Sequence, residues 1–91
     1  MDVRFYATLR QITGTKVVTF DLPADTTVRA LLEAATEQFP KLGPLIWTAD
    51  GALGDYLKVF VDGREIRHLA LLEPPLAAGS AVDIFPPVAG G

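Results

Sequence analysis

Residues 81–91 read AVDIFPPVAGG, an apolar strand followed by two prolines and an end made of small residues. The diproline at 86–87 has a fixed φ and favours polyproline II, so the segment should leave the fold as a short rod. The diglycine at 90–91 carries no side chains and can follow a narrow channel into another protein. The pattern predicts a folded domain over residues 1–85 and a flexible tail over residues 86–91, with the terminal carboxylate as the reactive group.

Several segments before residue 81 also show alternating apolar and polar residues, which is the pattern of half-buried strands. A turn at residues 13–15 joins the first two segments as a hairpin, and Asp62-Gly63 is a strong two-residue hairpin signal between the next two. Gly79-Ser80 is predicted to be a turn before the last strand. The predicted strands cover residues 2–9, 17–22, 56–61, 64–66 and 81–85.

One amphipathic helix is predicted between the second and third strands, because apolar residues recur there at i, i+3, i+4, i+7 and i+11. Asp25, Thr26 and Thr27 are candidate N-caps, and Pro40 ends the helix. The apolar positions are Val28, Leu31, Leu32, Ala35 and Phe39.

Residues 41–55 are punctuated by Gly and Pro and are expected to be irregular, pinned to the domain by Leu42, Leu45, Ile46 and Trp47. Because a helix of about 12 residues needs more than two strands beneath it, the strands most simply form one mixed sheet of four or five strands. We therefore predict an α+β fold of the β-grasp type, with one main helix across one face of the sheet.

Composition excludes several classes of function. The formal net charge is −3, from 8 Lys+Arg and 11 Asp+Glu, and no basic run could follow phosphates, so nucleic acid is not an expected partner. No apolar stretch approaches the ~20 residues that span a bilayer, and the first residues lack the layout of a signal peptide. We expect a cytoplasmic protein that does not bind membranes.

Catalysis and metal binding by the chain itself are not expected. Cysteine is absent, which excludes disulfides, thiolate metal sites and thiol nucleophiles. His68 is the only histidine and Ser80 the only serine, and Ser80 lies in a predicted turn where its hydroxyl has a local role. The Gly-containing segment 50–55 lacks the features of a phosphate loop.

Three aromatic residues are predicted to share the helix-free face of the sheet. If the last strand lies between the first and the third, Tyr6, Phe60 and Phe85 project from adjacent strands. Such a cluster has two interpretations: a docking patch for a partner protein, or a simple cover of the sheet. Arg4 and Arg10 flank it, either as solvated charges or as partners of acidic groups on another protein. The opposite neighbours, expected in the core, are Phe5, Val59, Val61, Val82 and Ile84.

The segment 76–91, LAAGSAVDIFPPVAGG, resembles the MoaD/ThiS group of ubiquitin-like sulfur carriers. Thr27-Val28 with Leu31-Leu32, and Val59-Phe60-Val61-Asp62-Gly63, extend the resemblance over essentially the whole chain. It looks closest to the small subunit of molybdopterin synthase and to the related prokaryotic small ubiquitin-like modifiers. The resemblance implies the ubiquitin-like form of the β-grasp fold.

The resemblance also implies a chemistry for the chain end. An ATP-dependent activating enzyme would adenylate the carboxylate of Gly91, and a sulfur donor protein would convert it to a thiocarboxylate. In the molybdopterin branch the thiocarboxylate would enter the large subunit of the synthase; in the modifier branch Gly91 would form an isopeptide bond with a target-protein lysine. The protein would be a cosubstrate with no bound cofactor, metal or catalytic residue. The residues that give the tail its reach are Pro86, Pro87, Val88, Ala89 and Gly90.

Three functions therefore remain as hypotheses. The leading one is sulfur donation in molybdenum cofactor biosynthesis. The second is protein modification, favoured by the length of the 41–55 segment. The third is a non-covalent interaction module with an incidental Gly-Gly end. The chain's own lysines, Lys16, Lys41 and Lys58, could accept a modifier, although lysines are ordinary surface residues.

Overall fold

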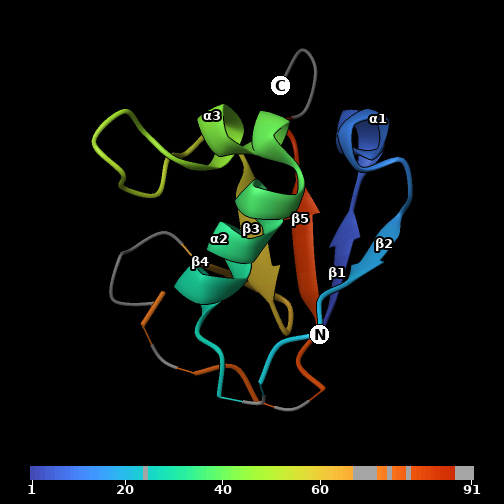
Figure 1. Cartoon of the computed structure of the whole chain (residues 1–91), viewed down its shortest axis with the longest axis vertical. Helices are drawn as coiled ribbons and strands as arrows, with labels where there is room; N and C mark the ends of the chain where they lie inside the picture. The colour runs from blue at the N-terminus through green and yellow to red at the C-terminus, as the bar shows by residue number, and fades with distance from the viewer. Residues whose placement is uncertain (24, 67–71, 74, 78, 88–91) are drawn as a thin grey trace.

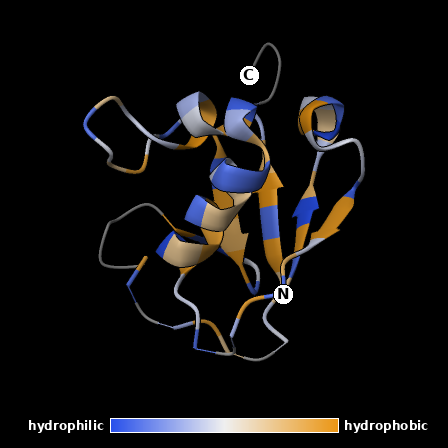
Figure 2. Cartoon of the chain, viewed as in Figure 1, coloured by the Kyte–Doolittle hydropathy of each residue, from blue (hydrophilic) through white to orange (hydrophobic). Residues whose placement is uncertain are grey.

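The computed structural model describes residues 1–23, 25–66, 72–73, 75–77 and 79–87. Its main helix, α2 (Val28–Gln38), lies across one face of a sheet (Figure 1). Hydrophobic residues colour much of the sheet behind this helix (Figure 2). The two layers bury one core between them, as the alternating strands and the amphipathic helix predict.

The sheet is mixed and has five strands in the order β2-β1-β5-β3-β4. Strand β5 pairs in parallel with β1, and the remaining pairs are antiparallel. The last strand therefore lies between the first and the third, which confirms the prediction of a β-grasp sheet. The strands are β1 (Asp2–Phe5), β2 (Val17–Thr19), β3 (Lys58–Val61), β4 (Arg64–Ile66) and β5 (Val82–Phe85).

Helix α2 follows its sequence pattern closely. The side chain of Thr27 accepts a hydrogen bond of 3.1 Å from the backbone N–H of Ala30, so Thr27 is the N-cap among the three candidates. Phe39 leaves the helical region before Pro40, as expected for a residue that precedes proline. The side chains that α2 buries are Val28, Leu31, Leu32 and Ala35.

The predicted first strand is too long. The chain turns at Ala7, which has a positive φ of 54°, and continues as η1 (Ala7–Leu9) and α1 (Arg10–Thr13). Alternation over residues 2–9 could not reveal this turn, because Leu9 is buried from the helical segment as it would be from a strand. Gly14 then ends α1 with a φ of 77°, at the predicted turn.

Residues 41–55 are only partly irregular, which corrects the prediction for this segment. Two short helices, η2 (Pro40–Leu42) and α3 (Gly43–Ile46), occupy its first part. Each begins with a proline in its first turn, where the missing N–H costs nothing. The predicted anchors hold, since Leu42 and Ile46 are buried and Leu45 and Trp47 pack against the core.

The Asp62-Gly63 turn is confirmed as the link between β3 and β4. Both residues have positive φ, 51° and 83°, as a type I′ hairpin turn requires. Among the predicted core residues, Phe5, Val59, Val82 and Ile84 are buried, and Val61 packs against them. In the described part of the chain, no helix is both long and apolar enough to cross a membrane.

Candidate functional site

The structure brings the three predicted aromatic residues together on the helix-free face of the sheet. The rings of Tyr6 and Phe85 are stacked, with centroids 4.2 Å apart and an interplanar angle of 10°. Phe60 meets Phe85 edge to face, with centroids 5.4 Å apart and planes at 82°. Both arrangements are favourable geometries for aromatic pairs. We call Tyr6, Phe60 and Phe85 the aromatic face.

Strand register explains why these rings meet. Phe60 lies opposite Asp83 across the antiparallel β3–β5 pair, and Phe85 is two residues along β5 on the same face. Tyr6 follows β1 directly, and its backbone N–H donates to the carbonyl of Ile84 at 3.2 Å. Phe85, on the central strand β5, therefore lies between the ring of Tyr6 on one side and the ring of Phe60 on the other.

Asp83 joins β5 to β1 beside the rings. Its carboxylate accepts from the Tyr6 hydroxyl at 2.9 Å and forms an ion pair with Arg4, whose Nε lies 2.6 Å from Oδ1. A second guanidinium nitrogen of Arg4 donates to Oδ2 at 3.2 Å, so the pair is bidentate. Only 9% of Asp83 is exposed. By accepting from the hydroxyl, the carboxylate therefore holds the Tyr6 ring in its position against Phe85.

The contacts of Asp83 shift the titration of both its partners. The hydrogen bond from the Tyr6 hydroxyl to the Asp83 carboxylate raises the pKa of Tyr6 above its ordinary value. The hydrogen bond to Asp83 likewise raises the pKa of Arg4, with the charge of Asp83 adding to the effect. Sequence reasoning missed Asp83; the available signal was its outward position in the last strand, two residues before Phe85.

The two arginines beside the aromatic face have partners within the chain. Arg4 pairs with Asp83 while its side chain remains 45% exposed, so it is a solvated surface charge with a partner in its own chain, and pairing with another protein stays a prediction. Arg10 donates from Nε to the backbone carbonyl of Phe5 at 3.2 Å. Both arginines are exposed, so they make these contacts at the surface beside the aromatic face.

The aromatic face borders a hollow of about 440 Å³ from which the chain leaves the sheet. Pro86 and Pro87 follow β5 directly and line this hollow, so the root of the predicted tail lies against the aromatic face. Val88, Ala89, Gly90 and Gly91 lie outside the described residues. The other residues lining the hollow are Lys58, Phe60, Gly63, Asp83 and Phe85.

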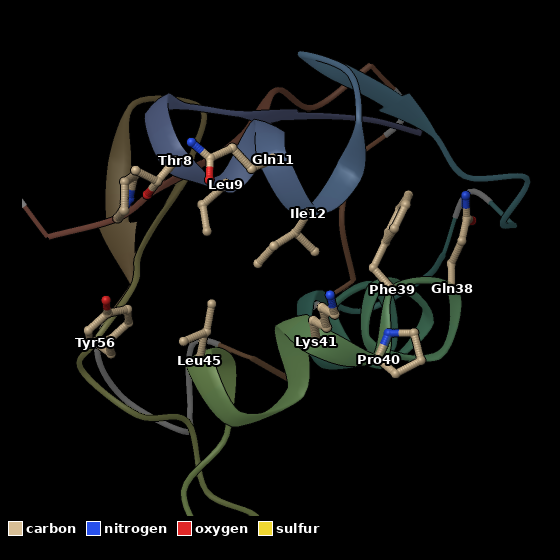
Figure 3. Close-up of a pocket in the computed structure, with 11 residues that line it drawn as sticks. Thr8, Leu9, Gln11, Ile12, Gln38, Phe39, Pro40, Lys41, Leu45 and Tyr56 are labelled. Carbon is tan, nitrogen blue, oxygen red and sulfur yellow. The ribbon is translucent and has the colours of Figure 1, made fainter.

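A second depression, of about 590 Å³, lies on another side of the tail root (Figure 3). We call it the lateral groove. Sequence reasoning missed it, because it forms only when residues 7–13 and 40–46 are helical. Pro86 lines both this groove and the hollow. The residues lining the lateral groove are Thr8, Leu9, Gln11, Ile12, Gln38, Phe39, Pro40, Lys41, Leu45, Tyr56 and Pro86.

Other candidate chemistry finds no support in the described residues. The Ser80 hydroxyl donates to Asp62 at 3.2 Å and so links its turn to the hairpin turn between β3 and β4, while His68 lies outside the described residues. No group of three or more potential metal ligands occurs in the described part of the chain. Of the three lysines named as possible acceptors of a modifier, Lys58 forms an ion pair with Glu65, with Nζ 3.7 Å from Oε2.

Sequence comparison with known families identifies the family of this chain. The sequence model of the ThiS family matches residues 3–91. The chain belongs to the ThiS family. This ThiS protein is 37% identical to small archaeal modifier protein 3 of Haloferax volcanii over 92 residues, which cover 100% of this chain and 98% of the relative. The family and the fold implied by the sequence resemblance are confirmed.

Solved structures support the same assignment. The crystal structure of small archaeal modifier protein 1 from Haloferax volcanii has a TM-score of 0.79 and 30% identity, covering 96% of this ThiS protein and 95% of that chain. A putative molybdopterin converting factor, subunit 1, from Pyrococcus furiosus has a TM-score of 0.74 and 25% identity, covering 96% and 95%. The family comprises small sulfur carriers and ubiquitin-like modifiers, which are in general not catalytic enzymes and which work with activating enzymes and with target or synthase proteins.

Proposed function

We propose that this protein carries an activated acyl group at its own C-terminus, the carboxylate of Gly91. The observation that carries the proposal is the position of Pro86 and Pro87, which leave the central strand against the exposed side of the aromatic face. A partner that covers this face meets the start of the tail at the same time. The family match across residues 3–91 supports the same chemistry.

Activation requires a second protein and ATP. A carboxylate is ionised at neutral pH and is a poor electrophile, whereas an acyl-adenylate has a good leaving group. The Gly91 carboxylate attacks the α-phosphorus of ATP, forming the acyl-adenylate and releasing pyrophosphate. The chain supplies the acyl group and the docking surface, and the activating enzyme supplies catalysis.

Two fates of the adenylate are supported by different relatives. Attack by a lysine amine of a target protein releases AMP and forms an isopeptide bond; the likeness to modifier proteins over the whole chain favours this fate. Attack by sulfide from a sulfur donor protein releases AMP and leaves a thiocarboxylate. The likeness to a putative molybdopterin converting factor subunit favours that fate, with the large subunit of molybdopterin synthase as acceptor.

Accurate-mass spectrometry of the protein from its native cells tests the proposal. Replacement of one terminal oxygen by sulfur, localised to Gly91 by alkylation, supports the carrier role; oxidation of Met1 gives a similar mass change but maps to the other end. A control lacking Gly90 and Gly91 must show neither modification nor conjugates. Unmodified Gly91 in the native protein, with no conjugates in the same cells, would refute the proposal.

Detection of conjugates needs a designed tail, because the sequence has no Lys or Arg after Arg67. Trypsin would therefore leave a long branch, residues 68–91, on a modified lysine. An Ala89→Arg variant shortens this branch to Gly-Gly, which standard enrichment detects. Gly-Gly on target lysines in cells that express Ala89→Arg, and not in cells that express its Gly90-Gly91 deletion, identifies a modifier.

A further inference from the structure

The lateral groove lies beside the tail root but outside the aromatic face. Figure 3 shows Ile12 and Leu45 on opposite walls, from α1 and α3, with Tyr56 at one end and Lys41 beside them. Leu9 is almost fully buried at the base, and Phe39 is half-buried. The groove therefore offers an apolar floor large enough for side chains of another protein.

The chemistry of the groove indicates what kind of ligand fits. Among the described residues that line the groove, Lys41 is the only charged one, and it is exposed. Gln11 and Gln38 add neutral amides that can donate to a carboxylate. A single cation beside an apolar floor suits a polypeptide segment with an apolar side chain and an acidic residue. Binding of a polyphosphate or nucleic acid would need several cations.

Tyr56 gives the groove an anchor for a protein partner. It is 54% exposed, the more exposed of the two large hydrophobic residues at the surface of the described chain; the other, Val17, is 41% exposed. Tyrosine contributes strongly to protein interfaces because its ring is rigid and its hydroxyl can still form a hydrogen bond. An exposed Tyr at the end of a groove with an apolar floor is therefore typical of an interaction surface.

Pro86 connects the groove to the proposed docking surface. It lines the lateral groove on one side and the hollow beside the aromatic face on the other. A protein that contacts both surfaces holds the tail root from two sides and fixes the direction in which the tail extends. Fixing that direction matters most to an enzyme that must bring the chain end to ATP.

We propose that the lateral groove is a second docking surface for the activating enzyme, which places an apolar side chain over Ile12 and Leu45 and a carboxylate beside Lys41. The inference rests on the proposed activation of Gly91. The enzyme then contacts the protein at two surfaces, the aromatic face and the lateral groove. The charge complementarity at Lys41 gives the contact its specificity and its dependence on salt.

ATP–pyrophosphate exchange with the purified activating enzyme of the same organism tests this inference. Lys41→Glu and Tyr56→Ser each change an exposed side chain, so both variants should fold with unchanged circular dichroism. Each should raise the KM for this protein about tenfold while kcat stays the same. Lys41→Arg should retain the wild-type KM, and Lys16→Glu, the same charge change outside the groove, should leave it nearly unchanged.

The outcomes separate the two proposals. Wild-type KM values for Lys41→Glu and Tyr56→Ser, with normal exchange by the unmodified protein, would overturn the groove assignment and leave the activation of Gly91 standing. An equal rise in KM for Lys16→Glu would also overturn it, because the effect would then reflect net charge. No exchange with the unmodified protein would overturn the activation of Gly91 and the groove assignment with it.

Discussion

Phe85→Ala separates the fold from the docking function. Phe85 is half-buried and contacts two rings, Tyr6 at 4.2 Å and Phe60 at 5.4 Å between centroids. Each aromatic pair contributes about 0.5–1.5 kcal/mol beyond area burial, so losing both contacts, with part of the buried ring, should cost about 2–3 kcal/mol of unfolding free energy. In a domain of this size that loss lowers Tm by about 10–20 °C.

The effect of Phe85→Ala on partner binding should exceed what its stability loss explains. If Phe85 is a central anchor of the interface, its removal costs 2 kcal/mol or more of binding free energy, about 30-fold in KM for the activating enzyme. The assay is ATP–pyrophosphate exchange at a temperature where circular dichroism shows the variant to be folded. The measured quantity is the ratio of the variant KM to the wild-type KM, and kcat should be unchanged.

Ile84→Val provides the control on the other face of the same strand. Ile84 is fully buried under α2, and the loss of one methyl group should cost about 0.5–1.5 kcal/mol of stability. Its KM should equal that of the wild type. A KM that tracks stability across the two variants, or a Phe85→Ala protein that folds with a wild-type KM, would refute the docking role of the aromatic face.

Three further variants test individual contacts. Thr27→Ala removes the N-cap of α2 and should lower the unfolding free energy by about 1 kcal/mol in urea denaturation, whereas Thr27→Ser should not. Gly63→Ala should cost about 1 kcal/mol by the same measure, because Gly63 has a φ of 83° and open space around it, leaving backbone strain as the only penalty. Asp83→Asn, in a Tyr56→Phe background that isolates Tyr6, should lower the pKa of Tyr6 as followed by tyrosinate absorbance. Since the folded pKa of Tyr6 is raised, its contribution to stability is present below pH about 10 and is lost as pH rises through the folded pKa. An unchanged titration in Asp83→Asn would contradict the ionised carboxylate of Asp83 as the cause.

Local patterns predicted the elements whose signals depend only on sequence spacing. Helical periodicity and the cap at Thr27 located α2, and Asp62-Gly63 located the hairpin between β3 and β4. The central position of β5 came from the β-grasp arrangement, and with it the meeting of Tyr6, Phe60 and Phe85.

The errors arose where tertiary contacts override the local pattern. Leu9 would be buried in a strand and in a helical turn alike, so its apolar character does not distinguish the two. The positive φ at Ala7, which ends the strand, is visible only in the structure. The Gly and Pro residues of segment 41–55 predicted irregular structure, although proline is also favoured in the first turn of a helix, where Pro44 lies in α3. Asp83 was missed because its role depends on the side chains that the β1–β5 register brings beside it.

The position of β5 links the fold to the proposed chemistry of the chain end. An edge strand has one neighbour, but β5 has β1 and β3 on its two sides, and each contributes an aromatic ring at the point where the tail begins. Val82 and Ile84 are buried beneath α2, so the strand that carries the tail is held by the core itself. Local opening of such a strand requires the loss of contacts on both sides and is correspondingly rare. A carrier whose chain end must reach another protein's active site gains a fixed starting point at Pro86, and the direction of the tail from there is set by the partner that contacts the surfaces on either side of it.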